Sequence, residues 1–173
     1  MAEQELIICE AQLEDAKSLS EVLKLVQEET DFLTRDSDSP AMSAEQAEIF
    51  IDSQLQKENA ICFVAKLGSQ VVGVLNVSAG TFAKTNHIGE VFIAVKKTYQ
   101  SYGIGSFLME ALIDWAEHTS AIRRLELEVQ VRNDKAVGLY QKFGFVIEGT
   151  KQRGAKTKNG EFLDVYAMAK LID

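Results

Sequence analysis

The sequence predicts an α/β (α+β) fold, in which a mixed central sheet carries helices on both faces. Two observations predict this class. Apolar strand-like runs follow one another in the middle of the chain, and strands then alternate with amphipathic helical segments. No repeat, low-complexity segment or shift in composition interrupts the pattern, so residues 1–173 are predicted to form one domain.

Composition limits the classes of partner. The 173 residues carry a formal net charge of −8, which argues against a nucleic-acid backbone or an anionic membrane as the main partner. The opening MAEQELIICE does not resemble a signal peptide, and no apolar run is long enough to span a membrane, so we expect a cytoplasmic protein. Cys9 and Cys62 lie in strand-like runs and are interpreted as buried thiols. No metal-ligand spacing occurs, so no metal is expected.

The first half of the chain is predicted from its periodicity. Residues 14–29 place apolar side chains at helical spacing, and residues 43–57 open with Ser43 followed by Gln46, the pattern of a capping box. The single proline and a cluster of Ser and Asp mark residues 30–42 as a loop. The predicted elements are a strand at 5–11, these two helices, and two strands within 60–80 joined by a turn at Gly68-Ser69.

The second half alternates strands with helices. A strand at 87–95 precedes a long amphipathic helix at 103–119, and a helix at 133–143 begins at Asn133, a favourable N-cap residue. The remaining predicted elements are strands at 123–131, 144–152 and 162–172, with a turn-rich link at 153–161 before the last strand.

Two glycines stand at the junction of strand 87–95 and the following helix, in Gln100-Ser101-Tyr102-Gly103-Ile104-Gly105. Glycine costs about 1 kcal/mol relative to alanine inside a helix, so its presence needs a reason. Without side chains, the first backbone N–H groups of the helix are open to a phosphate. A tight turn with positive φ, or close packing of the helix, explains the glycines equally well. No Gly-Lys-Ser/Thr follows, which excludes a Walker loop.

Two motifs identify a family. Gln100-x-x-Gly103-x-Gly105 resembles the acetyl-CoA-binding signature of the GCN5-related N-acetyltransferases (GNAT), and NDKAVGLYQKFGF at 133–145 resembles a second segment of the same family. HIGEVFIAV at 87–95 and NGEFLDVYAM at 159–168 further resemble a branch of small bacterial-type members. The order of strands and helices is also similar, so the resemblance covers nearly the whole chain. It implies a single N-acetyltransferase domain with a mostly antiparallel sheet. It also implies a bulge in the fourth strand and a splay between the fourth and fifth strands.

The resemblance implies that acetyl-CoA is the co-substrate. The pantetheine arm is expected to pair with the fourth strand in the splay, and the pyrophosphate is expected on the amides of residues 100–106. Asn133 has an N-cap role of its own, and Lys142 reads equally as a solvated lysine. The residues assigned to acetyl-CoA are Ile93, Val95, Gln100, Ser101, Gly103, Gly105, Ser106, Asn133 and Lys142.

Catalysis needs an acid for the departing thiolate and a base for the amine. A thiol has a pKa of about 8.5, and the resemblance assigns its protonation to the phenol of Tyr140, which could otherwise simply pack against the sheet. Glu90, at the head of the fourth strand, is the candidate base, with His87 as the alternative. A bulge would reset the alternation of side chains, so the face to which Glu90 points is left open.

The predicted reaction is acetyl transfer to a primary amine of a small molecule or a protein N-terminus, by direct attack in a ternary complex. A non-catalytic acyl-CoA-binding module and a structural protein whose glycines only make turns are the alternatives. The apolar run at 162–172 permits a homodimer. The acceptor side is expected to be lined by the first two helices and the loop 30–42 between them, with Asp31, Asp36 and Asp38. The late-strand residues Asp164 and Tyr166 are expected to close the other side.

Overall fold

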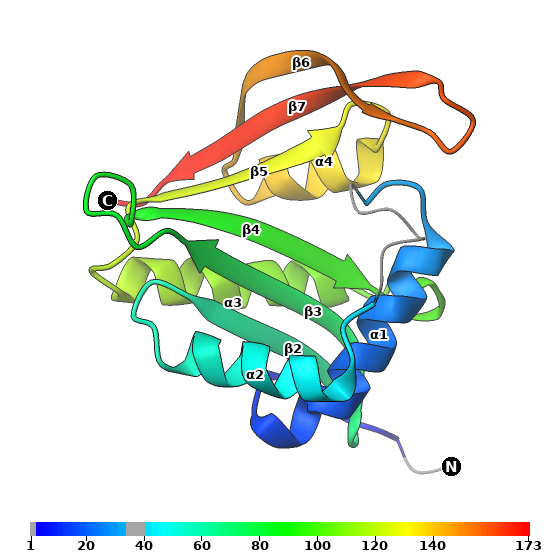
Figure 1. The fold of residues 1–173 in the computed structure, drawn as a ribbon, viewed down its shortest axis with the longest axis vertical. Helices are drawn as coiled ribbons and strands as arrows, with labels where there is room; N and C mark the ends of the chain where they lie inside the picture. Colours follow the sequence, from blue (N-terminus) through cyan, green and yellow to red (C-terminus); the bar gives the residue numbers. More distant parts are fainter. Residues whose placement is uncertain (1–2, 34–40) are drawn as a thin grey trace.

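The structure is a computed structural model, and it describes residues 3–33 and 41–173. Figure 1 shows the arrangement of its elements. In chain order they are β1 (Leu6–Glu10), a 3-10 turn η1 (Leu13–Asp15), α1 (Ala16–Glu29), α2 (Ala44–Leu55), β2 (Ile61–Leu67), β3 (Gln70–Ala79), β4 (Ile88–Val95), a 3-10 turn η2 (Lys97–Tyr99), α3 (Ile104–His118), β5 (Arg124–Gln130), α4 (Asp134–Lys142), β6 (Val146–Lys156) and β7 (Phe162–Leu171).

The seven strands form one mixed sheet in the order β1-β2-β3-β4-β5-β7-β6. All pairings are antiparallel except that of β4 with β5, which is parallel and runs only from Ile88↔Arg124 to Glu90↔Glu126. Beyond Glu90 the two strands diverge, so the sheet opens into a β4 arm and a β5 arm (Figure 1). The predicted mostly antiparallel sheet and its splay between the fourth and fifth strands are confirmed.

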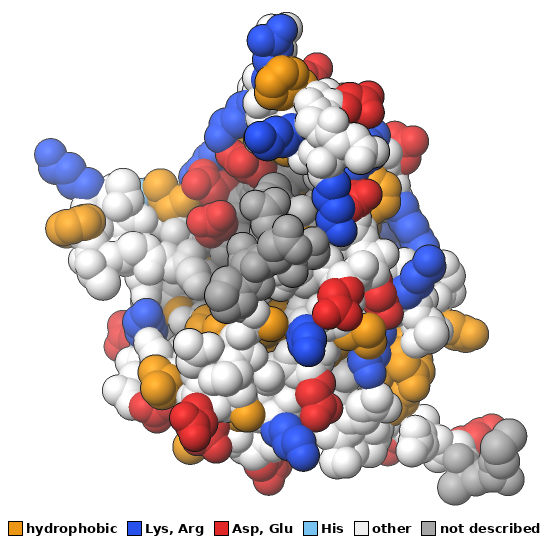
Figure 2. All heavy atoms as spheres, turned by 45° about the vertical axis from the view of Figure 1, so that its right-hand side comes forward, with side chains coloured by type: hydrophobic (Ala, Val, Ile, Leu, Met, Phe, Trp, Pro, Cys, Tyr) orange, Lys and Arg blue, Asp and Glu red, His pale blue; other side chains and the backbone are white. Residues whose placement is uncertain are grey.

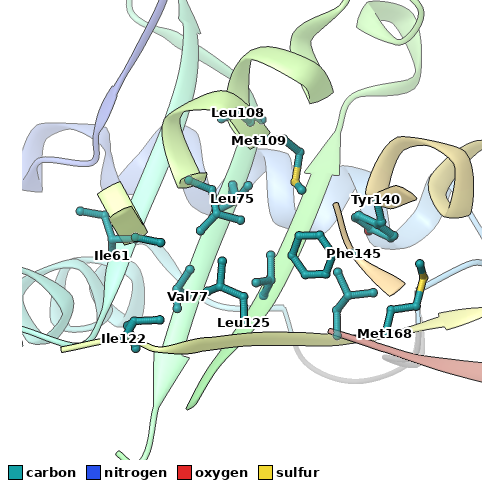
Figure 3. Close-up of a cluster of buried hydrophobic side chains, with 14 of the residues drawn as sticks. Ile61, Leu75, Val77, Leu108, Met109, Ile122, Leu125, Tyr140, Phe145 and Met168 are labelled. Carbon is teal, nitrogen blue, oxygen red and sulfur yellow. The ribbon is translucent and has the colours of Figure 1, made fainter. Parts of the chain in front are cut away.

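Helices cover both faces of the sheet, as predicted, because successive strand residues point to opposite faces. On β3, Val74 packs with α1 and α2 through Leu19 and Ile51, whereas its neighbour Leu75 packs with α3 through Leu108. Figure 1 shows α2 in front of the sheet and α3 behind it. Figure 3 shows the larger cluster, into which β5, α4 and β7 also send apolar side chains.

The predicted bulge in the fourth strand is wrong. β4 pairs with β3 in constant register from Gly73↔Val95 to Ala79↔Gly89. The sheet opens because β5 leaves β4, so no extra residue is needed in β4. Side chains therefore alternate without a break, and Glu90 shares the α1–α2 face with Ala94.

The helix starts agree with the predicted caps. The Ser43 hydroxyl accepts from the Gln46 amide (3.1 Å), and the Gln46 side chain accepts from the Ser43 amide (2.9 Å). The Asn133 side chain accepts from the Ala136 amide (3.4 Å) at the start of α4. Cys62 is buried and Cys9 is partly buried, and both thiols are free.

The late hairpin differs from its prediction. β6 continues to Lys156, through residues expected to form a link. Its register with β7 shifts between Lys151 and Ala155, and Arg153 has a φ of 55°. The turn-like sequence thus forms a bulge inside a strand, and the hairpin closes later, where the Thr157 amide donates to the Glu161 carbonyl.

Candidate active site

A cavity of about 1130 Å³ lies at the splay between β4 and β5. Its lining comes from α1, the start of the following loop, α2, β3, β4, residues 97–106, the end of β5 and α4. The volume exceeds the range of about 300–1,000 Å³ that is usual for one small ligand, so two substrates can meet in it. Figure 2 shows one face of the molecule, on which several Asp and Glu side chains gather in its upper part.

The start of α3 offers unpaired backbone donors. Gly103 precedes the helix with a left-handed φ of 82°, and the first intrahelical bond runs from the Phe107 amide to the Gly103 carbonyl (3.0 Å). The helical amides before Phe107 have no acceptor within the helix, and the described residues supply no side-chain cap. Gly103, Gly105 and Ser106 line the cavity at the positive end of the helix dipole. This geometry suits a phosphate.

The two glycines also have structural reasons. Gly103 has a positive φ, which side chains disfavour. A Cβ on Gly105 would stand 3.3 Å from Leu139 Cδ2, so α3 and α4 approach closely there. Both simple explanations of the glycines therefore hold, and the same absence of side chains leaves the amides open.

One lysine of α4 reaches the loop before α3, and a second reaches the first turn of α3. Lys142 Nζ lies 3.3 Å from Ser106 Oγ, and Lys135 Nζ lies 2.9 Å from Ser101 Oγ. Both lysines line the cavity. The sequence prediction included Lys142 but missed Lys135, although a spacing of seven residues places both on one face of a helix.

Gln100 organises the loop through its side chain. Its Nε2 donates to the Val95 carbonyl (3.1 Å), and its own amide donates to the Lys97 carbonyl (3.2 Å). The Gln100 amide, which was predicted to face phosphate, is thus engaged within the loop. The side chain fixes the position of the amides that follow.

Some backbone groups of β4 face the open space between β4 and β5. The Lys96 amide donates to the Val72 carbonyl (2.9 Å), and hydrogen-bonded pairs alternate along an antiparallel ladder. Even-numbered residues of β4 therefore bond to β3, whereas the backbone of Ile93 and Val95 faces the β5 arm. β5 pairs with β4 only as far as Glu90, so the backbone of Ile93 and the amide of Val95 are open to an extended ligand, whereas the Val95 carbonyl accepts from Gln100.

Tyr140 combines packing with access to the cavity. Its ring centroid lies 6.0 Å from that of Phe145 in the core, and the residue is 8% exposed (Figure 3). Burial raises the pKa of Tyr140 to about 12. The phenol therefore carries its proton at neutral pH and lines the cavity as a potential acid.

Glu90 lies at the apex of the splay and lines the cavity. Its carboxylate makes no hydrogen bond or ion pair with another residue of the part that the structure describes. The other lining glutamates have partners: Glu29 accepts from the Lys97 amide (2.9 Å), and Glu128 pairs with Lys151. Glu90 is thus the lining glutamate for which the described residues offer no partner.

Two further side chains bear on the choice of base. The sequence prediction missed Glu128, although alternation along β5 places it on the same face as Glu126, the partner of Glu90. His87 is not part of the cavity lining; it precedes β4, and its carbonyl accepts from the amides of Arg123 and Arg124. The alternative base is therefore not supported.

The half of the cavity proposed for the acceptor has an apolar wall, and its floor becomes more polar towards the apex of the splay. The floor is formed by the β3–β4 pairs Val74↔Ala94, Asn76↔Phe92 and Ser78↔Glu90, so polarity rises towards the apex. The wall residues are Leu23, Val26, Leu33, Met42 and Phe50.

Some predicted acceptor residues lie elsewhere. Asp31, Asp164 and Tyr166 are not in the lining, and Asp164 instead accepts from the Arg153 amide (3.1 Å). Asp36 and Asp38 lie outside the described residues. Across residues 3–33 and 41–173, no group of three His, Cys, Asp or Glu side chains is placed to hold a metal ion, and no helix is long and apolar enough to cross a membrane.

Comparisons with known proteins agree with this geometry. Residues 22–145 match the family described as the acetyltransferase (GNAT) family. The chain is 34% identical over 108 residues to L-amino acid N-acetyltransferase AaaT of Escherichia coli (strain K12), an alignment that covers 62% of this chain and 66% of that protein.

Two solved structures are similar over almost their full lengths. The structure of a GNAT-family acetyltransferase from Streptococcus pneumoniae has a TM-score of 0.94 at 45% identity and covers 97% of this chain and 100% of its own. YncA of Salmonella typhimurium, a putative acetyltransferase solved with acetyl-CoA, has a TM-score of 0.85 at 17% identity and covers 97% and 94%. The second comparison shows the fold alone.

Proposed function

Because this chain belongs to the acetyltransferase (GNAT) family, we propose that it transfers the acetyl group of acetyl-CoA to a primary amine by direct attack in a ternary complex. The family resemblance and the fold predicted from the sequence are confirmed. The activity, the site residues and the extent of residues 1–173 as one domain are proposals, since the aligned segment spans 66% of the curated relative.

One observation carries the proposal: a single cavity joins a phosphate-binding half to a half that suits an amine. On one side stand the open amides of α3, with Lys135 and Lys142 beside them. On the other side stands the carboxylate of Glu90, which has no partner among residues 3–33 and 41–173. The edge of β4 connects the two halves, and its outward backbone groups fit the amides of a pantetheine arm.

Two residues of the chain then carry out the two proton transfers of the reaction. Acetyl-CoA supplies an activated thioester. An amine with a pKa near 10 is nucleophilic in only about one molecule in a thousand at pH 7, and Glu90 takes its proton directly or through a water molecule. A C–N bond forms, the C–S bond breaks, and Tyr140 gives its proton to the sulfur. The backbone amide of Ile93 or Val95 is placed to polarise the carbonyl.

The acceptor is proposed to be a primary amine attached to an apolar body. Apolar contact is offered by Leu23, Phe50 and Phe92, and Glu90 lies at the polar end of the same half of the cavity. The similarity to an L-amino acid N-acetyltransferase supports a small molecule as the acceptor. A protein N-terminus with an apolar first residue fits the same half of the cavity and is the second candidate.

The first test is binding of acetyl-CoA. A ligand at about 100 times its dissociation constant stabilises the folded chain by about 2.7 kcal/mol, which is visible as a melting shift. Gly105→Asp puts a side chain and a negative charge among the amides and should abolish the shift. Its matched control is Gly149→Asp, because a side chain at Gly149 enters open space on β6. A shift retained by Gly105→Asp would contradict the phosphate site.

The second test is turnover. Thiol release is measured with acetyl-CoA and 2-phenylethylamine, L-phenylalanine, or a peptide with a free apolar N-terminus. The proposal expects release with at least one of them. A melting shift without any release would favour the non-catalytic acyl-CoA-binding module. Absence of both would leave the glycines as turn residues only.

A further inference from the structure

One short segment is hydrogen-bonded to both arms of the splay. Residues 29–33, from the last residue of α1 into the loop that follows, are here called the strap. Four of its residues, Glu29, Thr30, Phe32 and Leu33, line the cavity. The arms themselves pair only as far as Glu90, so a segment bound to both lies across their open side.

The first bond joins the strap to the β4 arm. Glu29 Oε2 accepts from the Lys97 amide at 2.9 Å. Lys97 is the first residue of η2, two residues after the end of β4 and before the loop that leads into α3. The strap is thus attached next to the predicted phosphate site.

The second bond joins the strap to the β5 arm. Gln130, the last residue of β5, is 3% exposed, and its Nε2 donates to the Asp31 carbonyl at 2.9 Å. Its Oε1 accepts from Arg132 Nε at 2.8 Å, and the Arg132 guanidinium lies 5.2 Å from the centre of the Phe32 ring. Both ends of one buried amide therefore act on the strap, one directly and one through Arg132.

Gln130 also fixes the start of α4. Its carbonyl accepts from the Asn133 amide at 2.9 Å, and Asn133 caps the helix that carries Tyr140. The same residue thus sets the acceptor wall on one side and the helix of the predicted acid on the other. A buried amide of this kind is retained in one orientation because any other would leave its donor or acceptor unpaired.

We propose that the strap holds the two arms at a fixed separation, and that Gln130 is the positioning residue that sets the acceptor wall. Gln130 does not touch the reacting atoms; it acts through Asp31 and Arg132. The inference rests on the proposed function in one respect, because the wall is read as the acceptor side. The hydrogen bonds themselves do not depend on that reading.

Two substitutions at Gln130 distinguish the hydrogen bond donated by its Nε2 from the hydrogen bond accepted by its Oε1. Gln130→Leu removes both hydrogen bonds and keeps the volume close to that of the native side chain. Gln130→Glu keeps an acceptor for Arg132 but cannot donate to the Asp31 carbonyl when ionised. If the bond to Asp31 holds the strap, both variants lose it. Asp15→Asn is the matched control, because Asp15 is also 3% exposed and hydrogen-bonded, to Lys66 at 2.9 Å, outside the cavity lining.

Two readouts decide the question. Hydrogen exchange of a peptide covering residues 28–33 should become about tenfold faster in both Gln130 variants, while a peptide from α3 stays unchanged. With 2-phenylethylamine, or whichever amine of the panel the native chain acetylates, KM should rise about fivefold or more. The dissociation constant of acetyl-CoA should stay within about twofold of native. Asp15→Asn should change neither readout.

The outcomes are distinguishable from failure of the proposed function. If hydrogen exchange of residues 28–33 is unchanged in Gln130→Leu, the proposal that Gln130 holds the strap is wrong. Faster exchange with an unchanged amine KM overturns the positioning role. An equal rise in the acetyl-CoA dissociation constant also overturns it, because the effect would then be general. A native chain that binds acetyl-CoA but acetylates no amine contradicts the proposed function, and the exchange experiment still decides whether Gln130 holds the strap.

Discussion

The two halves of the cavity are built by different means. The cofactor half comes mainly from one stretch of chain, residues 95–106, and presents backbone groups at a strand edge and a helix start. The acceptor half assembles side chains from α1, α2, β3 and β4, which are distant in sequence. Backbone donors are available in any chain that forms the same turn, so the cofactor half can be recognised from a short sequence motif. The second half depends on individual side chains, which leaves room for a change of substrate without a change of fold.

The largest expected effect tests the point where the halves meet. Tyr140→Phe removes the hydroxyl but keeps the ring against Phe145. Loss of a general acid should lower kcat by about 10²- to 10⁴-fold and leave the melting shift with acetyl-CoA intact. Tyr166→Phe, outside the cavity lining, is the control. Turnover that survives Tyr140→Phe would mean that another group or water protonates the sulfur.

The next effect belongs to the acceptor half. Glu90→Gln should lower kcat by about 10- to 10²-fold at pH 7 with no loss of acetyl-CoA binding. The loss should shrink towards pH 10, because the amine then loses its proton unaided. The comparison is Glu128→Gln, whose carboxylate is paired with Lys151. A larger loss in Glu128→Gln would transfer the role of base to β5.

A smaller effect sharpens the description of the cofactor half. Replacing both Lys135 and Lys142 by Met should raise the dissociation constant of acetyl-CoA by about tenfold at low salt. The effect should fade as salt is added, because both ammonium groups are exposed to solvent. Lys156→Met, on the late hairpin, serves as control. A salt-independent change would show that the lysines act through packing instead of charge.

The smallest effect at neutral pH concerns stability. Burial raises the pKa of Tyr140 to about 12 from an ordinary value near 10. The folded state holds this proton more tightly than the unfolded state. The contribution to stability is therefore complete below pH 10 and is lost as the pH rises towards 12.

Urea unfolding measures this loss. At pH 11 the free energy of unfolding of the native chain should have fallen by about 1 kcal/mol relative to that of Tyr140→Phe, whereas below pH 9 the difference between the two chains should not change with pH. The pKa of Cys62 is also raised to about 12, but this thiol is present in both chains and cancels in the comparison. Parallel pH curves for the two chains would place the Tyr140 hydroxyl in contact with water.

The sequence was most informative where structure is local. The caps at Ser43 and Asn133, the glycine turn and the element order depend on neighbouring residues, and the structure contains them. Long-range features were harder to predict. The bulge inside β6 depends on its register with β7. The bulge expected in β4 is absent, and the sheet opens because β5 diverges from β4 after Glu90 while staying paired with β7.

Contacts between side chains of the site were hard to predict for the same reason, because they join residues that are distant in sequence. Lys135 and Glu128 became visible only when α4 and β5 were placed beside the loop before α3 and the apex of the splay. Gln130 carried no signal at all, since its partner at Asp31 is ninety-nine residues away. The face to which Glu90 points likewise could be assigned only from the alternation of an unbulged strand.

The short β4–β5 pairing has a consequence for how the chain folds. β2, β3 and β4 form a meander with short connections, and β6 and β7 form a hairpin, so each can assemble locally. Joining them closes a long loop through α3, at the larger entropic cost. At this junction a Cβ on Gly89 would stand 2.6 Å from Val77 Cγ1 and 3.2 Å from Leu125 Cδ2. The Val77 contact lies within the β3–β4 pair and the Leu125 contact lies at the junction with β5. We therefore expect one added methyl group at Gly89 to disturb both, and urea unfolding of Gly89→Ala should show the loss of stability.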